Sequence, residues 1–221
     1  MRIAVYTSIT AAKDTLKAPR DPSGADFILF SDQPPLAHDD PAAASCWKPR
    51  PACNLFADPR RNSRAPKLLA HQYVPDYDFS LWIDGSFRLL VSPRDLVEKH
   101  LGAADIALFR HTTRVCIYDE AEICANLRLD DPAIIAAQVA KYRLEGFPAK
   151  QGLNEGGVIL RRHGPLMERF NDAWWSEYCR RSCRDQLSLN YVLHKLGVRL
   201  AHLPGTVLNN PGLVLYEEHR R

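Results

Sequence analysis

Residues 77–87 read Tyr-Asp-Phe-Ser-Leu-Trp-Ile-Asp-Gly-Ser-Phe, and this stretch decides the fold. Residues 79–83 are mostly apolar and β-forming, and the run stops at Asp84-Gly85-Ser86. Such a run is typical of a buried strand in a mostly parallel sheet. Ligands of open α/β sheets bind beyond the carboxyl ends of the strands, so we expect Asp84 to face a ligand. Because Asp-Gly is also a common turn dipeptide, the neighbouring motifs must separate the two interpretations.

Other short apolar runs alternate with helical patterns along the chain. Strands are predicted at residues 3–6, 27–30, 106–109, 156–160 and 198–203, and helices at 92–102, 131–144, 165–180 and 185–196. The polar segment 7–22 after the first run is expected to be a ligand loop. This alternation predicts one α/β domain over residues 1–221, with a mostly parallel central sheet flanked by helices. We expect Trp82 to lie in its core.

Residues 33–62 show neither helical nor strand periodicity, and nine of the 16 prolines lie between Pro19 and Pro66. A long stretch of this kind predicts a Pro-rich functional loop or a flexible cover. Pro66 is then expected to open a helix that reaches about His71, with Ser63 or Asn62 as its cap. That arrangement would place Arg64 and Lys67 in the first turn of the helix.

Bulk composition limits the classes of partner. The net charge is +3, and no basic stripe of the kind that binds nucleic acid is present. No run approaches the roughly 20 apolar residues of a transmembrane segment, although peripheral contact with a membrane stays open. The first residues do not resemble a signal peptide, so we expect a cytoplasmic protein with reduced cysteines.

Four groups of polar residues follow predicted strands or open predicted helices. They are Arg61, Arg64 and Lys67; Asp84, Gly85 and Ser86; Asn154, Glu155, Gly156 and Gly157; and Arg184, Asp185 and Gln186. Each group alone is a weak signal, since charged residues usually lie on a solvated surface. An α/β sheet would bring all four to one edge.

The order and spacing of these groups resemble the nucleotide-sugar glycosyltransferases with the GT-A fold, in which a strand ends in an Asp-x-Asp-type motif. A closer resemblance is to a family of hexosyltransferases with bacterial and plant members, formerly catalogued as a domain of unknown function. The motifs that carry it are Arg61-Asn62-x-Arg64-x-Pro66-Lys67, Leu81-Trp82-Ile83-Asp84-Gly85-Ser86, Asn154-Glu155-Gly156 and Arg184-Asp185-Gln186-Leu187-Ser188. The resemblance runs from about Ile3 to the C-terminus and implies a GT-A-like domain. It also implies a nucleotide-sugar donor, UDP-linked, and a glycan, lipid-linked or small acceptor.

Breaking a sugar–diphosphate bond requires compensation of the negative charge that builds on the leaving group. Arg61, Arg64 and Lys67 are the candidates for that role, and a solvated basic surface is the alternative. Asp84, with Gly85 and Ser86 beside it, is expected to bind the ribose of the nucleotide or a divalent cation, Mn²⁺ or Mg²⁺.

Ser86 replaces the second acid of the usual motif, and one carboxylate with one hydroxyl is a poor site for either ion. The resemblance implies that a late histidine would complete such a site, as a C-terminal histidine does in related GT-A enzymes. His219 is the first candidate and His202 the second.

Asp185 is expected to accept hydrogen bonds from the donor sugar or to act as the general base, and Glu155 is the competing base. Gln186 would assist. Asn154, Gly156 and Gly157 would border the acceptor. An acid at Asp185 also fits the ordinary first turn of a helix.

The leading hypothesis is a glycosyltransferase that moves a hexose from a nucleotide-diphosphate sugar. One alternative is a hydrolase of the same family that acts like a ceramidase, since a plant relative has been assigned such an activity. Another is a module that binds nucleotide sugars without catalysis, because the second acid is missing at Ser86.

Overall fold

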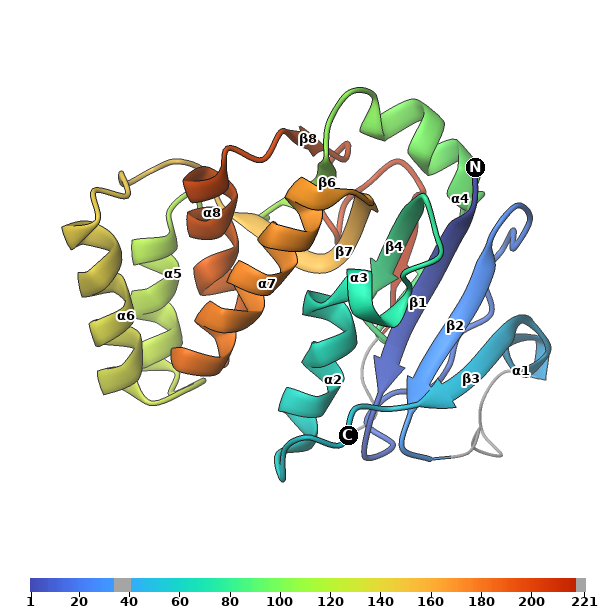
Figure 1. Ribbon diagram of the computed structural model, residues 1–221, viewed down its shortest axis with the longest axis horizontal. Helices are drawn as coiled ribbons and strands as arrows, with labels where there is room; N and C mark the ends of the chain where they lie inside the picture. The colour runs from blue at the N-terminus through green and yellow to red at the C-terminus, as the bar shows by residue number, and fades with distance from the viewer. Residues whose placement is uncertain (34–40, 218–221) are drawn as a thin grey trace.

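The computed structural model describes residues 1–33 and 41–217, and its centre is a seven-stranded sheet (Figure 1). The strands are β1 (Ile3–Ile9), β2 (Asp26–Ser31), β3 (Trp47–Pro51), β4 (Phe79–Ile83), β6 (Ile106–Arg110), β7 (Asn154–Arg162) and β8 (Leu200–His202). Their spatial order is β3-β2-β1-β4-β7-β6-β8. Strand β7 is antiparallel to β4 and β6, and the other pairs are parallel. The predicted α/β fold with a mostly parallel sheet is confirmed.

Both faces of the sheet are buried, which explains why its strands are continuous apolar runs. Neighbouring residues of a strand point to opposite faces. In β1, Ala4 and Tyr6 therefore belong to one buried cluster, and Ile3 and Val5 belong to the other. Trp82 is fully buried in the first cluster, as predicted.

Helices and a small second sheet cover the two faces. One face carries α2 (Pro59–Leu68), α3 (Ala70–Tyr73), α7 (Pro165–Arg180) and α8 (Asp185–Leu196) (Figure 1). The other carries α4 (Pro93–Leu96), which continues as a π-helical turn over Val97–Leu101, and the two-stranded sheet of β5 (Phe87–Leu89) and β9 (Val214–Tyr216).

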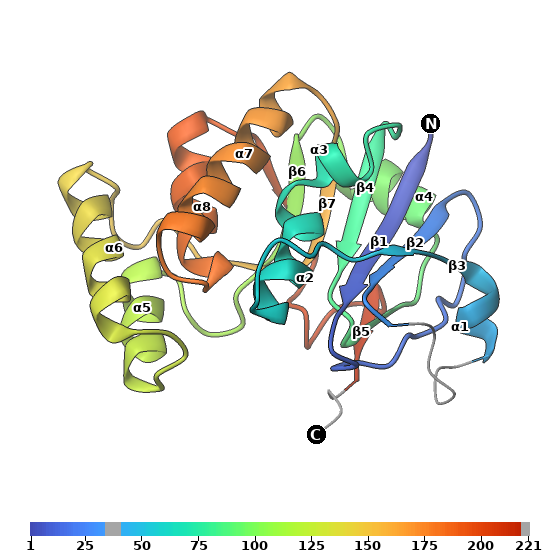
Figure 2. The ribbon, with the colours of Figure 1, turned by 60° about the horizontal axis from the view of Figure 1, so that its bottom comes forward.

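The helices α5 (Ile117–Asn126) and α6 (Pro132–Leu144) form a hairpin that packs on α8. Figures 1 and 2 both show this hairpin at the end of the molecule farthest from β3. The predicted helices at 131–144, 165–180 and 185–196 are confirmed, whereas α5 was not expected from the sequence.

The prediction of an irregular loop over 33–62 is wrong for the described residues from 41 onward. Helix α1 (Pro41–Cys46) and strand β3 lie in this segment, and α2 begins at Pro59. The prolines hid β3 because proline is rare inside sheets, but β3 lies at the sheet edge, where proline is tolerated.

The strands bring the polar motifs to one edge of the sheet. The parallel strands β1, β2 and β4 all end there, and the antiparallel β7 begins there. Ile83 pairs with Val158, and the Asp84 N–H donates a hydrogen bond to the Gly157 carbonyl oxygen at 2.8 Å. The Asp84 motif and the glycine pair of β7 are therefore neighbours.

Candidate functional site

A pocket of about 670 Å³ opens at this edge, between the end of β1, the start of α2 and the turn before α8. Most of the residues that line it are polar or charged. The lining residues are Ser8, Ile9, Thr10, Ala11, Lys13, Asp14, Asp58, Pro59, Arg60, Ser63, Arg64, Trp82, Asp84, Gly85, Leu129, Tyr178, Cys183 and Arg184. Four of the lining residues are cationic and three are acidic. An anionic ligand is therefore favoured only where a cation already pairs with the acids.

Lys67 lies behind the pocket wall and links two of the predicted groups. Its Nζ is 2.6 Å from Asp185 Oδ2 and 3.5 Å from Asp84 Oδ1, and the Lys67 side chain is only 2% exposed. Arg64 adds a second cation, with its Nε 3.5 Å from Asp185 Oδ2. Charged groups are rarely buried unless they are paired. The predicted convergence of Asp84, Lys67 and Asp185 is therefore present.

The two cations keep Asp185 ionised. Burial alone raises the pKa of the Asp185 carboxyl, but the Lys67 ammonium and the Arg64 guanidinium outweigh burial and hold that pKa well below its usual range. Asp185 Oδ2 is buried and lies against both cations, with Lys67 Nζ close enough to donate a charge-assisted hydrogen bond. The two cations therefore fix this oxygen in place.

Two glycines make this packing possible. A Cβ at Gly156 would lie 3.2 Å from Lys67 Nζ, so a side chain there would press on the buried ammonium. A Cβ at Gly85 would lie 2.8 Å from Asp14 Oδ2, closer than real contacts allow. The missing side chain at Gly85 lets Asp14 approach the Asp84 turn.

The predicted helix start at Pro66 is wrong, although residues 66–71 are helical except at Leu69, because they form the end of α2 and the start of α3. Helix α2 begins seven residues earlier than expected, with Asp58 as its N-cap, whose side chain accepts a hydrogen bond from the Arg60 N–H. Lys67 consequently lies in the last turn of α2. The free backbone N–H groups at the start of that helix therefore do not add to its positive charge. The N-terminus of α2, at Pro59 and Arg60, lines the pocket instead.

Arg61 lies away from the carboxylates. Its guanidinium carbon is 5.9 Å from the ring centroids of both Phe56 and Tyr178, a cation–π arrangement. Arg60, which adjoins the basic cluster and was expected to lie on a solvated surface, lines the pocket and pairs with Asp58.

Glu155 and Asp185 are separated by the backbone of β7. Because the Gly156 position faces Lys67 and Asp185, the adjacent Glu155 points to the opposite side of the strand. Glu155 Oε1 accepts hydrogen bonds from the Thr112 N–H at 3.1 Å and from the Thr112 hydroxyl at 3.2 Å. Burial raises the pKa of the Glu155 carboxyl.

The remaining residues of these motifs have supporting contacts. Gln186 Nε2 donates a hydrogen bond to the Asn154 carbonyl oxygen at 3.3 Å, which ties the start of α8 to β7. The Asn154 side-chain oxygen lies 3.1 Å from His202 Nε2. Trp174 Nε1 donates to the Asp185 carbonyl oxygen at 2.9 Å and fixes the first turn of α8.

The residues around Asp84 do not fit a divalent cation well. Asp84 Oδ1 already accepts a hydrogen bond from Trp82 Nε1 at 2.7 Å and lies beside the Lys67 ammonium. Ser86, at the position of the second acid, is buried, and its carbonyl oxygen accepts a hydrogen bond from the Glu217 N–H. Mg²⁺ and Mn²⁺ require several oxygen ligands.

No third ligand appears near Asp84 in the part of the chain that the structure describes. Among residues 1–33 and 41–217, no group of three or more His, Cys, Asp or Glu side chains is arranged to hold an ion. The contact of His202 with Asn154 gives this histidine a different partner. His219 lies outside the described residues, so its role as a ligand stays a prediction.

Several pocket residues could not be found from the sequence. Lys13 and Asp14 come from the loop after β1, and Tyr178 comes from the last turn of α7. The sequence predicted a ligand loop at 7–22 without assigning a role to any residue in it. Tyr178 has only the pattern of a core aromatic residue, and most of it is indeed buried.

The fold and the site together define a class of protein. Two solved structures of the galactosyltransferase LgtC superpose on the chain, one in complex with donor and acceptor sugar analogs and one of an active-site mutant. The first has a TM-score of 0.50 at 12% identity, covering 98% of this chain and 87% of that chain. The second has a TM-score of 0.51 at 11% identity, with the same coverage. The chain therefore has the GT-A fold of nucleotide-sugar glycosyltransferases.

Within that class, the chain belongs to the family described as TOD1/MUCI70, glycosyltransferase-like domain, which matches residues 46–204. The Arabidopsis thaliana protein named "Probable hexosyltransferase MUCI70" is 32% identical over 220 residues, covering 89% of this chain and 38% of that protein. Alkaline ceramidase TOD1, also from Arabidopsis thaliana, is 27% identical over 150 residues, covering 63% of this chain and 32% of that protein. The chain thus spans well under half the length of either relative. The resemblance read from the motifs is confirmed.

Proposed function

We propose that the pocket binds a nucleotide-diphosphate hexose, UDP-linked, and that the chain transfers the hexose to a glycan, a lipid-linked molecule or a small acceptor. One observation carries the proposal: a buried ammonium, Lys67, joins Asp84 and Asp185 behind a pocket lined by further cations. The family, one relative of which is named a hexosyltransferase, supports the same reaction. A cytoplasmic location remains part of the proposal.

The pocket cations would stabilise the leaving diphosphate. Arg64, Arg184 and Lys13 line the pocket from three different segments, so they can surround a diphosphate. Arg64 shares its charge with Asp185, whereas Lys13 and Arg184 have no carboxylate ion pair among the described residues. Preorganised cations of this kind lower the barrier because negative charge develops on the leaving group in the transition state.

Asp185 would bind the donor sugar and would not act as a base. A carboxylate held ionised by two cations has little tendency to take a proton, because its pKa is far below the working pH. Its side chain is 13% exposed, and a sugar hydroxyl would donate a hydrogen bond to the accessible part of its carboxylate. In the proposed reaction, the bond from the sugar C1 to the phosphate oxygen breaks and the acceptor oxygen bonds to C1. The acceptor proton passes to the departing phosphate.

Calorimetric titration tests donor binding directly. The native chain should bind UDP and UDP-hexoses in EDTA as well as in Mn²⁺, since the described ligands around Asp84 make a poor cation site. Asp84→Asn should weaken UDP binding at least about tenfold, because a charge-assisted contact is lost. Asp95→Asn, which removes only a surface ion pair with Lys99, is the matched control.

Absence of binding to any nucleotide sugar would contradict the proposal. Binding that requires Mn²⁺ and disappears in His219→Ala would instead show that the C-terminal histidine completes a cation site. Binding without transfer or donor hydrolysis would identify a non-catalytic module.

Hydrolysis of a ceramide-like amide is the second candidate, because one relative is named an alkaline ceramidase. The assay is release of free long-chain amine from ceramide by the purified chain. Amine release that survives Asp84→Asn, in the absence of any UDP-hexose turnover, would favour this reaction over glycosyl transfer.

A further inference from the structure

The Lys67 ammonium lies between the carboxylates of Asp84 and Asp185. Each carboxylate has an oxygen within 3.5 Å of Lys67 Nζ, one from the end of β4 and one from the start of α8. The ammonium is also 5.8 Å from the centroid of the Trp82 ring, a cation–π distance. On the side of β7, a Cβ at Gly156 would lie 3.2 Å from Nζ. Lys67 therefore fills the space between the two acids that the sheet edge brings together.

A divalent cation held by these two acids would need the same space. Mg²⁺ binds oxygen ligands at about 2.1 Å, and its usual ligands are one or two carboxylates together with substrate phosphates. Asp84 and Asp185 are such a pair, but Lys67 Nζ lies 2.6 Å from Asp185 Oδ2. Asp84 Oδ1 also accepts a hydrogen bond from Trp82 Nε1, which is a donor and cannot be a metal ligand. A cation would therefore have to displace the ammonium.

The surroundings of Lys67 oppose that displacement. Helix α2, which carries Lys67 in its last turn, packs against both β1 and α7 (Figure 1). The Lys67 side chain is 2% exposed, and its carbonyl oxygen accepts a hydrogen bond from the buried Arg161 guanidinium at 2.9 Å. An ammonium that lost both acids would be an unpaired charge in the protein interior, which is strongly unfavourable. The lysine is therefore a fixed part of the site.

The charges around Asp84 cancel without a metal ion. Asp84 and Asp185 carry two negative charges, and Lys67 and Arg64 carry two positive charges beside them. Arg184, which lines the pocket from the turn before α8, adds a further positive charge. A diphosphate would thus meet neutralised acids and a cation. Metal ions neutralise charge in this way where acids face the phosphates of a nucleotide.

We propose that Lys67 takes the place of a divalent cation, so that the pocket binds a nucleotide-diphosphate hexose independently of metal ions. The identity of the donor rests on the proposed function. The position of the ammonium between Asp84 and Asp185 carries the rest. Removal of the lysine side chain should therefore leave a pair of carboxylates that gains affinity for Mn²⁺.

Titration with Mn²⁺ in the absence of any nucleotide tests the role of Lys67. Binding is measured as the loss of the electron paramagnetic resonance signal of free Mn²⁺. Lys67→Ala should bind Mn²⁺ at least about tenfold more tightly than the native chain, because two carboxylates then face an open space. Mn²⁺ should also raise the denaturation midpoint of this variant and not that of the native chain, since a ligand of the folded state stabilises it. The second measurement applies even if the variant is less stable.

Lys67→Met is the matched control. It removes the charge but keeps most of the side-chain volume, so it should not gain affinity for Mn²⁺. Lys67→Ala/Asp84→Asn should lose the gained affinity, because an amide replaces one of the two carboxylate ligands. Two results would overturn the proposal: equal affinities for Mn²⁺ in Lys67→Ala and the native chain, or Mn²⁺ binding by the native chain that Asp84→Asn abolishes.

Donor turnover separates the role of Lys67 from the proposed function. The native chain should turn over a UDP-hexose in EDTA at a rate comparable to that in Mn²⁺. Turnover that strictly requires Mn²⁺ would overturn the role of Lys67 and leave the glycosyltransferase function standing. Absence of turnover under both conditions would contradict the glycosyltransferase function, and the Mn²⁺ titration would still decide the role of Lys67.

Discussion

At the scale of single residues, Lys67 connects more parts of the structure than its position in the sequence indicated. It is enclosed between two carboxylates, and its own carbonyl oxygen accepts a hydrogen bond from Arg161, a fully buried guanidinium. Arg161 also donates to the Tyr6 hydroxyl at 2.9 Å, so the end of α2 is connected to β1 and β7 through one side chain. The ammonium is thereby held at a fixed point relative to the sheet edge.

Replacing Lys67 with methionine should destabilise the fold. Loss of the buried ammonium leaves Asp84 without its cation and Asp185 with Arg64 alone, at a cost of about 3 kcal/mol in the free energy of unfolding. Urea denaturation at pH 7 measures the change. Lys48→Met removes an exposed pair with Asp26 and should leave stability nearly unchanged, because solvent screens an exposed ion pair. If the two variants were equally stable, the charge of Lys67 would not be what holds the carboxylates.

At the scale of elements, strand β3 shows how the sheet protects its edge. The Ala52 N–H donates to the Ser31 carbonyl oxygen in β2, so the N–H groups of Arg50 and Lys48, two and four residues earlier, also face β2. The N–H positions of 49 and 51 face outward, and both residues are prolines without a donor. The outer edge of β3 therefore offers few hydrogen bonds to another strand.

Restoring those donors should promote self-association. Pro49→Val/Pro51→Val adds two outward N–H groups to an exposed edge, and we expect oligomers or aggregates in size-exclusion chromatography at concentrations where the native chain is monodisperse. Lys48→Val/Arg50→Val is the control, because it adds β-branched side chains without new outward donors. Equal aggregation in both variants would mean that apolar side chains, and not edge donors, are responsible.

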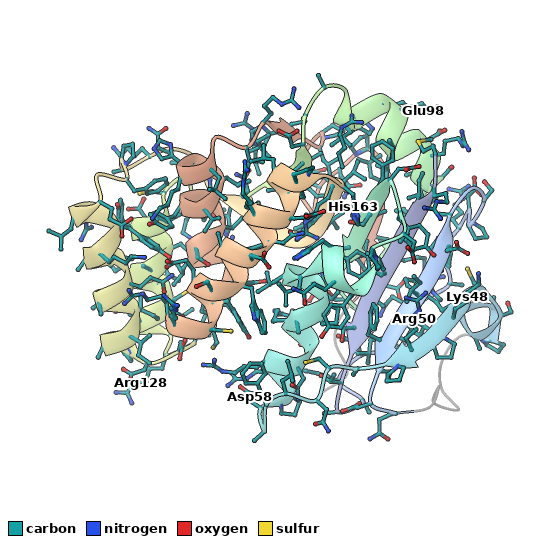
Figure 3. All side chains as sticks on the ribbon, viewed as in Figure 1. Lys48, Arg50, Asp58, Glu98, Arg128 and His163 are labelled. Atoms are coloured by element: carbon teal, nitrogen blue, oxygen red, sulfur yellow. The ribbon has the colours of Figure 1, made fainter. Side chains whose placement is uncertain are left out.

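At the scale of the whole molecule, buried ionisable groups predict loss of stability in acid. Burial lowers the pKa of His163 to about 4, helped by the nearby charge of Arg161, whereas an unfolded histidine titrates at about 6.5. His163 lies where β7 leads into α7 (Figure 3), and its Nε2 has no hydrogen-bond partner in the described chain. Between about pH 6.5 and pH 4, His163 therefore binds a proton in the unfolded chain but not in the folded chain.

The direction in which stability changes with pH follows from the linkage between proton binding and folding. Stability should be full above about pH 6.5 and should fall as the pH drops toward 4, since protons bind preferentially to the unfolded state. Asp185, whose folded pKa is lowered, adds a further loss below about pH 4. Between pH 7 and pH 4, the denaturation midpoint should change less with pH for His163→Gln than for the native chain. An unchanged dependence of the midpoint on pH in His163→Gln would refute the assignment.

Much of this architecture could be predicted from local patterns. Pro165 and the Asp131-Pro132 pair mark helix starts that the structure places as expected, because their signals are local. Helix α2 was misplaced because two prolines, Pro59 and Pro66, give the same local signal, and only the Asp58 cap distinguishes them. Helix α5 was missed since its N-cap, Cys116, makes no side-chain bond of the usual kind.

The site was predictable where strand ends determine it. Asp84 was found because it ends a buried strand, and Asp185 because it opens a helix. The contributions of Asp14 and Leu129 depend on how distant loops fold over the sheet edge, which no local pattern encodes. Pocket walls built by loops are therefore the part that sequence reasoning leaves undetermined.

The β5–β9 pair has a practical consequence for anyone who labels or immobilises this protein. Because β9 pairs with β5 directly after the Asp84 turn, and the Glu217 N–H donates to the Ser86 carbonyl oxygen, a fusion partner joined directly after β9 would lie beside the edge of the sheet that holds the pocket. A fusion partner joined ahead of β1 would lie at the opposite end of that strand, where Figure 1 marks the N-terminus. Purification handles and fluorophores therefore belong at the amino end.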